Sequence, residues 1–415
     1  MDSPEPPPGE DADAATTDGG ATAGEHVDVG VLIAHSPEAD TDDLRSFTGR
    51  MATDAVDELE TATDTEWRFH TEELARLSDN DTRRPSEFLD RATHRMVEGP
   101  YDLTVVVTDV PLLSNRQRFV PGLASPLGRI AVVSTEILQR ATRKGPARPL
   151  DSPPVRWNAA TLLLHLVGHV LGARHRDGGG VMAPFRFDPD RRGVPAFDAT
   201  VERYLYRIRD RVPEEEVPTR GPLRRLGFYA VSAARNPGQI LRALVDSRAP
   251  LLPLSLPKLA TAAVTPTLVI VFSAESWDVG FNMTDATAAA FAVASVVFAA
   301  LYLLFVQNLS FPRERHRVIT EHTALVNVTV FLVLLFAMVG LFALVGAIIL
   351  TIELLVFPQN LMSNWPSLEE PAVGIADLVR TGAFISTVGV LTGALAGGLE
   401  SRTILRHLAL FHDTP

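Results

Sequence analysis

Three histidines and one glycine stand close together in the stretch HLVGHVLGARH, which covers residues 165–175. His165 and His169 are four residues apart, so on a helix both imidazoles lie on one face, with about 6 Å between their Cβ atoms. Gly172 can adopt the left-handed conformation that ends a helix, which would let the chain turn back and bring His175 to the same place. Three imidazoles with a fourth position open form a ligand set typical of catalytic zinc. The spacing therefore predicts one zinc ion, held by these three histidines.

The spacing resembles the H-E-x-x-H-x-x-G-x-x-H signature of the metzincin metallopeptidases, with one departure. In those enzymes a glutamate follows the first histidine. The resemblance implies that this glutamate takes a proton from zinc-bound water and passes it to the leaving amine. In this chain the position is Leu166, and a leucine side chain transfers no proton. The motif is complete in metal ligands and lacks its general base.

The alternative interpretation is that His165 and His169 are ordinary histidines on a half-buried helix. Gly172 and His175 favour the metal site over this alternative, and so does Met182, in the segment GVMAP at residues 180–184. The resemblance implies that Met182 forms the methionine turn beneath the metal. We therefore expect a metal site with Gly172 and Met182 in structural roles.

Residues 27–210 resemble one metzincin family, the archaemetzincins, in the order of their elements. The resemblance rests on VTD at residues 107–109, FVPGLA at 119–124, GRIAVVS at 128–134, the histidine motif and Met182. It implies an α/β zincin domain with a mixed sheet and an aminopeptidase-like or peptide-binding role. It also implies a second, structural zinc on cysteines near the methionine turn. This chain has Arg176 and Val181 there and no cysteine at all, so we expect a single zinc ion.

Composition limits the remaining possibilities. The chain has 50 acidic against 38 basic residues and a net charge of −12, which does not favour nucleic-acid binding. The absence of cysteine excludes disulfides, thiolate metal sites and cysteine catalysis. Any metal must bind to histidine and oxygen.

The order of apolar patterns predicts the domains. Residues 1–25 are acidic and rich in Pro, Gly and Ala, so we expect a disordered tail that is not a signal peptide. Residues 26–212 then alternate strand and helix signals, as expected for the zinc domain. The expected strands are 27–34, 65–70, 103–110 and 129–134, and the expected helices are 44–59, 86–97, the histidine helix and 198–212. Residues 213–250 are expected to be a linker followed by an amphipathic segment at the membrane surface.

Four later stretches are long and apolar enough to span a bilayer, at residues 251–273, 286–306, 324–350 and 381–399, followed by a tail at 400–415. Arginines stand before the first stretch. Arg313, Arg315 and Arg317 lie between the second and third stretches, and Arg402 and Arg406 follow the fourth. The two other loops carry acidic residues, Glu275 and Asp278 in one and Glu369 and Glu370 in the other. The positive-inside rule then predicts an integral membrane protein with the zinc domain and both termini in the cytoplasm.

The predicted spans contain no ionisable residue near their middle, which disfavours a transport function. Gly389, Gly393 and Gly397 recur every four residues in the fourth span. This pattern favours close helix packing inside the bundle, and homo-oligomers are the alternative.

Two functions remain open from the sequence. One is a membrane-anchored metallopeptidase of impaired or absent activity, acting on a peptide or protein. The other is a pseudoenzyme that binds zinc or a peptide without turnover, or a membrane scaffold.

Overall fold

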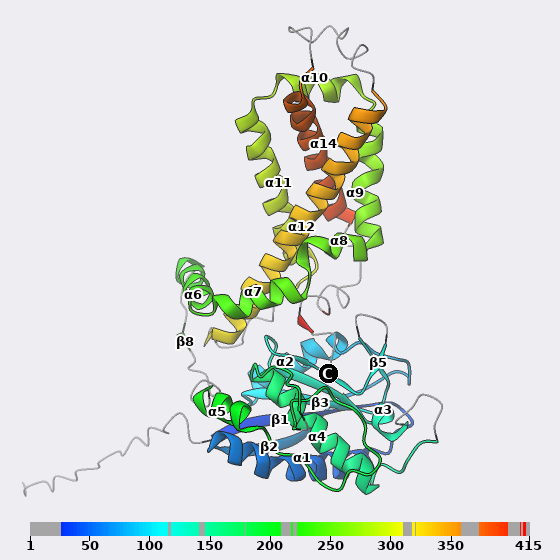
Figure 1. The fold of residues 1–415 in the computed structure, drawn as a ribbon, viewed down its shortest axis with the longest axis vertical. Coiled ribbons are helices and arrows are strands. Elements are labelled where there is room, and N and C mark those ends of the chain that lie inside the picture. Colours follow the sequence, from blue (N-terminus) through cyan, green and yellow to red (C-terminus); the bar gives the residue numbers. More distant parts are fainter. Residues whose placement is uncertain are drawn as a thin grey trace, which may run out of the picture.

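The computed structural model describes residues 26–114, 118–140, 146–178, 180–208, 217–218, 222–309, 318–319, 321–357, 373–396, 407 and 410–411. The described part consists of an α/β domain and a tall helical bundle above it (Figure 1). The tail at residues 1–25, Gly397, and the loop charges Arg313, Arg315, Arg317, Glu369, Glu370, Arg402 and Arg406 lie outside the described residues.

A mixed five-stranded sheet forms the centre of the α/β domain, as the sequence predicted. Its order is β2-β1-β3-β7-β6, from β1 (His26–His35), β2 (Glu66–Arg76), β3 (Leu103–Thr108), β6 (Gly122–Ser125) and β7 (Ile130–Ser134). The first four strands in this order are parallel, and β6 pairs antiparallel with β7 at the sheet edge. Strands β1, β3 and β7 are rich in β-branched residues and almost wholly buried, as expected for strands covered on both faces.

The helices α1 (Thr41–Thr63) and α4 (Pro153–Val170) pack on one face of the sheet. Asp40 caps α1 by accepting hydrogen bonds from the amides of Asp42 and Asp43. The apolar stripe of α1, including Phe47 and Met51, is fully buried against α4 and the sheet. Helix α5 (Ala199–Ile208) packs beside α1. This layer contains the histidine motif.

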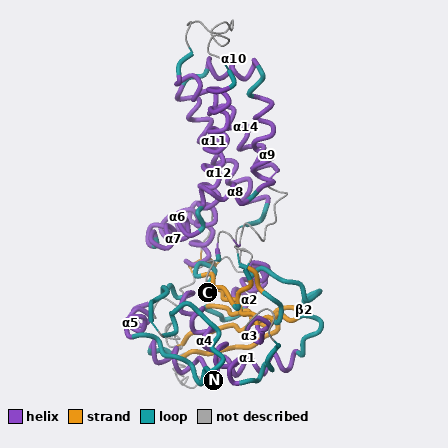
Figure 2. The backbone as a smooth tube through the Cα atoms, turned by 45° about the vertical axis from the view of Figure 1, so that its right-hand side comes forward, coloured by secondary structure: helices purple, strands orange, loops and turns teal. Residues whose placement is uncertain are grey.

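The opposite face of the sheet is covered by α2 (Ser86–Glu98) and is continuous with the core of the bundle. Leu32, Val106 and Val132 belong to the same buried cluster as residues of the bundle and Leu410. Figure 2 shows the strands lying between helices of the domain and the base of the bundle. The histidine helix and the bundle therefore lie on opposite faces of the sheet.

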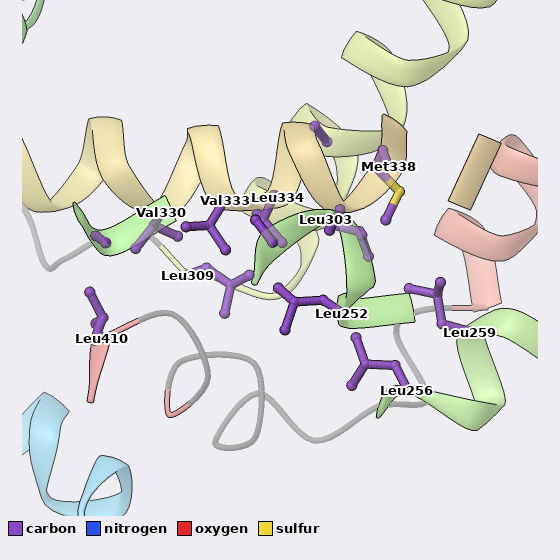
Figure 3. Packing of buried hydrophobic residues seen from close by; sticks show 14 of the residues in the cluster. Leu252, Leu256, Leu259, Leu303, Leu309, Val330, Val333, Leu334, Met338 and Leu410 are labelled. Carbon is purple, nitrogen blue, oxygen red and sulfur yellow. The ribbon is translucent and has the colours of Figure 1, made fainter. Parts of the chain in front are cut away.

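The bundle begins after α6 (Pro222–Arg235) and α7 (Pro237–Asp246) and contains η2 (Ala249–Leu251), α8 (Leu252–Ser255), α9 (Pro257–Ile270), α10 (Ala274–Asn282), α11 (Asp285–Val306), α12 (Glu321–Leu355) and α14 (Ile375–Ala396). Short strands β8 (Val217–Pro218) and β9 (Val318–Ile319) pair near its base. Figure 3 shows Val330, Val333 and Leu334 of α12 above Leu309 and Leu252 in the apolar core.

Three described helices are long and apolar enough to cross a membrane: α11, α12 and α14. A fourth span results if the helical stretches 237–255 and 257–270, which meet at a bend of 53°, count as one. This bend lies in the stretch that several prolines interrupt, where each proline removes a backbone donor.

Two glycines of the fourth apolar stretch pack inside the bundle. A Cβ atom on Gly389 would lie 2.8 Å from Cγ2 of Thr267, and one on Gly393 would lie 2.9 Å from Cβ of Ala263. Both contacts are with α9. The glycines therefore allow α9 and α14 to approach closely within one chain.

The structure adds elements that the sequence analysis assigned to loops. The long loop between residues 110 and 129 contains β4 (Leu112–Leu113) and β5 (Phe119–Val120), which pair with each other, and the edge strand β6. Helix α3 (Thr135–Arg140) follows β7 directly. Strand β2 reaches Arg76, well beyond the expected end at residue 70, because it pairs with β1 along its whole length.

Candidate metal centre

Helix α4 carries the first two histidines of the motif. Pro153 and Pro154 occupy its first turn. Backbone amides have no partner within the helix there, so proline's missing amide hydrogen costs no hydrogen bond. The helix ends at Val170, and Gly172 has a φ of 89°, in the left-handed region that favours glycine. Tyr204 of α5 covers this turn: its Oη donates to the Leu171 carbonyl at 3.1 Å and would lie 2.7 Å from a Cβ atom on Gly172. The turn therefore requires glycine for its conformation and for the space.

The turn brings all three histidines together. Their Nε2 atoms are separated by 3.1 Å between His165 and His169, 2.9 Å between His169 and His175, and 3.2 Å between His165 and His175. His165 is fully buried, His169 is half-buried and His175 is exposed. The group therefore extends from the core of the domain to its surface.

Backbone carbonyls fix the protonation of two of these rings. Nδ1 of His165 lies 2.7 Å from the Val181 carbonyl oxygen, and Nδ1 of His169 lies 3.0 Å from that of Ala173. A carbonyl oxygen only accepts hydrogen bonds, so both Nδ1 atoms must donate. In the neutral rings, each Nε2 then has an unprotonated lone pair, the form that binds metal.

This arrangement fits a cation. Two unprotonated Nε2 atoms 3.1 Å apart repel each other unless a proton or a metal cation lies between them. Nitrogen ligands about 2.0–2.1 Å from a tetrahedral zinc ion lie about 3.3 Å from one another, close to the separations found here. His165, His169 and His175 could therefore hold a metal ion.

Met182 packs against helix α4 between the two helical histidines. It is buried, and its sulfur would lie 2.5 Å from a Cβ atom on Gly168, the residue just before His169. Its carbonyl accepts from the amide of Arg176 at 3.0 Å, which ties the segment to the residue that follows His175. The segment thus contacts His165 through the Val181 carbonyl and the chain next to His175 through Arg176.

Leu166 is completely buried and faces the sheet edge. Its Cδ1 would lie 2.7 Å from a Cβ atom on Gly122 in β6, and Leu162 is also in contact there. The side chain is part of the apolar core formed by α1, α4 and the sheet. Position 166 is therefore filled by tightly packed hydrocarbon next to the metal centre.

The metal centre holds no carboxylate among the described residues. The group of ligand atoms within 4.8 Å of one another consists of the three histidines alone. Asp177, the acid nearest to the motif in the sequence, has an exposed side chain and does not belong to the group.

Four contributors were missed by the sequence analysis: the carbonyls of Val181 and Ala173, the glycine at position 168, and Tyr204. Every residue type has a backbone carbonyl, so the sequence gives no signal for such a contact. Gly168 had a detectable signal, because a glycine inside an otherwise apolar helix lowers helix propensity and points to a packing constraint.

Comparisons with known proteins give partial matches. No family model matches the chain. Archaemetzincins from two strains of Halobacterium salinarum are 36% identical over 94 residues, which cover 23% of this chain and 53% of each relative. The chain therefore spans about half the length of the curated relatives that it matches.

Solved structures give a weaker likeness. The archaemetzincin of Methanopyrus kandleri is 22% identical, with a TM-score of 0.34, over 45% of this chain and 97% of that one. A zinc-dependent peptidase from Methanocorpusculum labreanum is 20% identical, with a TM-score of 0.31, over 42% of this chain and 99% of that one. The archaemetzincin of Archaeoglobus fulgidus, complexed with malonate, is 19% identical, with a TM-score of 0.27 and the same coverages. The sequence match therefore shows that a stretch of 94 residues of this chain is similar to the archaemetzincins.

Proposed function

We propose that the chain is a membrane-anchored, zinc-binding homologue of the metallopeptidases in which peptide hydrolysis is impaired or absent. The observation that carries the proposal is the convergence of three Nε2 atoms within 3.2 Å of one another beside the buried hydrocarbon of Leu166. One zinc ion per chain would bind to His165, His169 and His175.

The three histidines have clear roles in this proposal. When bound, zinc would lower the pKa of a coordinated water to about 7 and polarise a carbonyl oxygen. The Val181 and Ala173 carbonyls hold the rings of His165 and His169 in the metal-binding tautomer. His175 closes the group from the exposed side of the turn.

Proton transfer is the step that the chain's own residues do not support. Leu166 offers no proton acceptor, and no described carboxylate belongs to the histidine group. General acid and base catalysis contributes about 10²- to 10⁴-fold to such reactions. We infer that this protein cleaves peptides more slowly than an ordinary metallopeptidase by about this factor, or does not cleave them at all.

The alternative is a pseudoenzyme in which the zinc centre stabilises the domain or binds a peptide without turnover. The packing of Leu166 against Gly122 favours it, because the residue at the position of the base belongs to the hydrophobic core. A membrane scaffold with no metal is a third possibility, and the preserved histidine geometry argues against it.

Metal analysis and a hydrolysis assay of the purified full-length protein test the proposal. We expect one zinc per chain, removable by chelation, and peptide cleavage at least about 100-fold below that of an ordinary peptidase. Absence of stoichiometric metal would reject both zinc hypotheses, and ordinary cleavage rates would reject the impaired mechanism.

We also propose that the zinc domain lies on the cytoplasmic side of the membrane. Helices α6 and α7 support this orientation, because they combine arginines with exposed apolar side chains, including Leu223, Leu226 and Leu241. Such helices lie at a membrane surface, where arginines favour the cytoplasmic leaflet.

A further inference from the structure

A buried carboxyl group lies inside the helical bundle, far along the chain from the metal centre. Helix α12 continues to Leu355, beyond the apolar stretch 324–350, and so includes Glu353. The side chain of Glu353 is 1% exposed, and neither of its carboxyl oxygens has a hydrogen-bond partner. Glu353 therefore lies near the end of the helix, away from the middle of the span, where the sequence has no ionisable residue. An ionisable residue inside a membrane bundle indicates a functional site.

The carboxyl group lies against helix α14. A Cβ atom on Gly382 would be 3.6 Å from Oε2 and 3.9 Å from Oε1 of Glu353, and 3.8 Å from Cγ2 of Ile349. The carboxyl group therefore lies between α12 and α14, at van der Waals distance from position 382.

A second polar group is buried next to this contact. The hydroxyl of Thr381 is also without a partner, and the residue is fully buried. Thr381 packs on Gly280 of α10, where a Cβ atom would lie 2.8 Å from the Thr381 Cβ. Figure 1 shows α10 across the end of the bundle remote from the sheet, where it packs on α14.

The charged groups of the surrounding helices are engaged elsewhere or exposed. Arg380 of α14 donates to Asp285 at 2.8 Å, to Asp377 at 3.3 Å and to the Phe281 carbonyl at 3.4 Å. On α10, Glu275 and Asp278 are exposed, and Lys258, the one charged residue of α9, is also exposed. No described ion pair includes Glu353, so its ionised form would have no compensating charge.

An isolated carboxylate is strongly disfavoured in such a place, whereas the neutral acid is tolerated. We propose that Glu353 is a proton-binding site of the bundle, in which the protonated carboxyl group packs between α12 and α14. A hard cation is a poorer occupant, because it requires about six oxygen ligands and Cγ2 of Ile349, a hydrocarbon atom, lies at the same contact.

Carbodiimide labelling of the full-length protein in lipid vesicles tests the proposal. Dicyclohexylcarbodiimide partitions into the bilayer and reacts with carboxylic acids in their protonated form. Peptide mass spectrometry should find an adduct on Glu353 at pH 6–7, and the adduct should disappear in Glu353→Gln. Glu275→Gln, which removes an exposed acid from the same end of the bundle, should leave the adduct unchanged. Suppression of the adduct by Na⁺ or Ca²⁺ at constant pH would show a cation site and overturn the proposal. A folded wild type without any adduct at pH 6–7 would also reject the proton site.

Discussion

The sulfur of Met182 lies against Gly168, the residue directly before His169 in helix α4. A Cβ atom at position 168 would lie 2.5 Å from this sulfur and 3.3 Å from the methyl carbon of Met182. The contact fixes the distance between the histidine helix and the segment whose carbonyl orients His165. Because position 168 is glycine, the segment that contains Val181 and Met182 can approach the metal ligands this closely.

Gly168→Ala should disturb this contact. We expect the extra methyl group to destabilise the domain by about 1–3 kcal/mol through overpacking and to weaken zinc binding. Gly49→Ala in helix α1 is the matched control, because a Cβ atom there meets nothing within 4 Å and alanine favours a helix by about 1 kcal/mol. Thermal denaturation and zinc titration would measure both effects. Equal Tm and zinc affinity in the two variants would contradict the role of the contact.

Replacing a metal ligand should have a larger effect. His169→Ala leaves two imidazoles, and we expect loss of stoichiometric zinc and a lower Tm, since a bound metal stabilises only the folded domain. His94→Ala removes an exposed histidine paired with Glu98 on α2 and should leave zinc content unchanged. Elemental analysis of both purified variants would measure their zinc content per chain. Full zinc occupancy in His169→Ala would refute the ligand assignment.

The pH dependence of stability should show the effect of Asp102. Burial raises the pKa of this carboxyl group to about 6, although the amide of Asp28 donates to it at 3.0 Å and Arg129 acts in the opposite direction to burial. Because the folded pKa lies above the unfolded value, the folded domain binds more protons between about pH 4 and 6 and loses stability as pH rises through that window.

Asp102→Asn should therefore raise the stability at pH 7 by on the order of 1–2 kcal/mol, with solvent screening allowed for. Asparagine keeps an oxygen that accepts from Asp28, so the structure need not change. The gain should vanish below about pH 4. Asp57→Asn, at an exposed position on α1, serves as the control, and denaturant titrations across pH would measure both. A gain independent of pH would point to a cause other than ionisation.

The membrane orientation can be tested by protease protection. In sealed right-side-out vesicles, residues 26–250 should resist added protease, because a cytoplasmic domain lies inside. Permeabilisation with detergent should make the same region accessible. Immunoblotting of the N-terminal domain reports the outcome, and its digestion in intact vesicles would reverse the proposed orientation.

The sequence predicted the strands and helices whose patterns are strong. Strand β3 is an uninterrupted apolar and β-branched run, and α1 has an apolar stripe at helical spacing, so hydrophobic periodicity alone indicates both. The spacing of His165, His169 and His175 was informative because helix geometry and one glycine turn fix their relative positions. The assignment of these residues as metal ligands stays a prediction until metal content is measured.

Other features depend on contacts that sequence patterns do not contain. Strand β6 has only four residues and becomes a strand through its pairing with β7. The burial of Glu353 depends on the exact end of α12 and on helix α14 packed opposite it. The shared core of the sheet and the bundle is tertiary packing between segments far apart in the sequence, and no local rule predicts it.

If the metal centre lacks only its general base, the substitution Leu166→Glu should restore it. The variant introduces a carboxylate beside His165, whereas Leu166→Gln introduces the same shape without a proton acceptor. Both should retain the zinc content of the wild type, which shows that the buried site tolerates the polar side chain.

The measurement is the zinc-dependent rate of peptide cleavage by the wild type and these two variants at equal metal occupancy. We expect a rate in Leu166→Glu at least about 10-fold above the wild type, with the 10²- to 10⁴-fold contribution of acid and base catalysis as the full effect, and no increase in Leu166→Gln. A wild type that already cleaves peptides at ordinary peptidase rates, with no gain in Leu166→Glu, would show that another residue supplies the base and that the metal centre is not deficient.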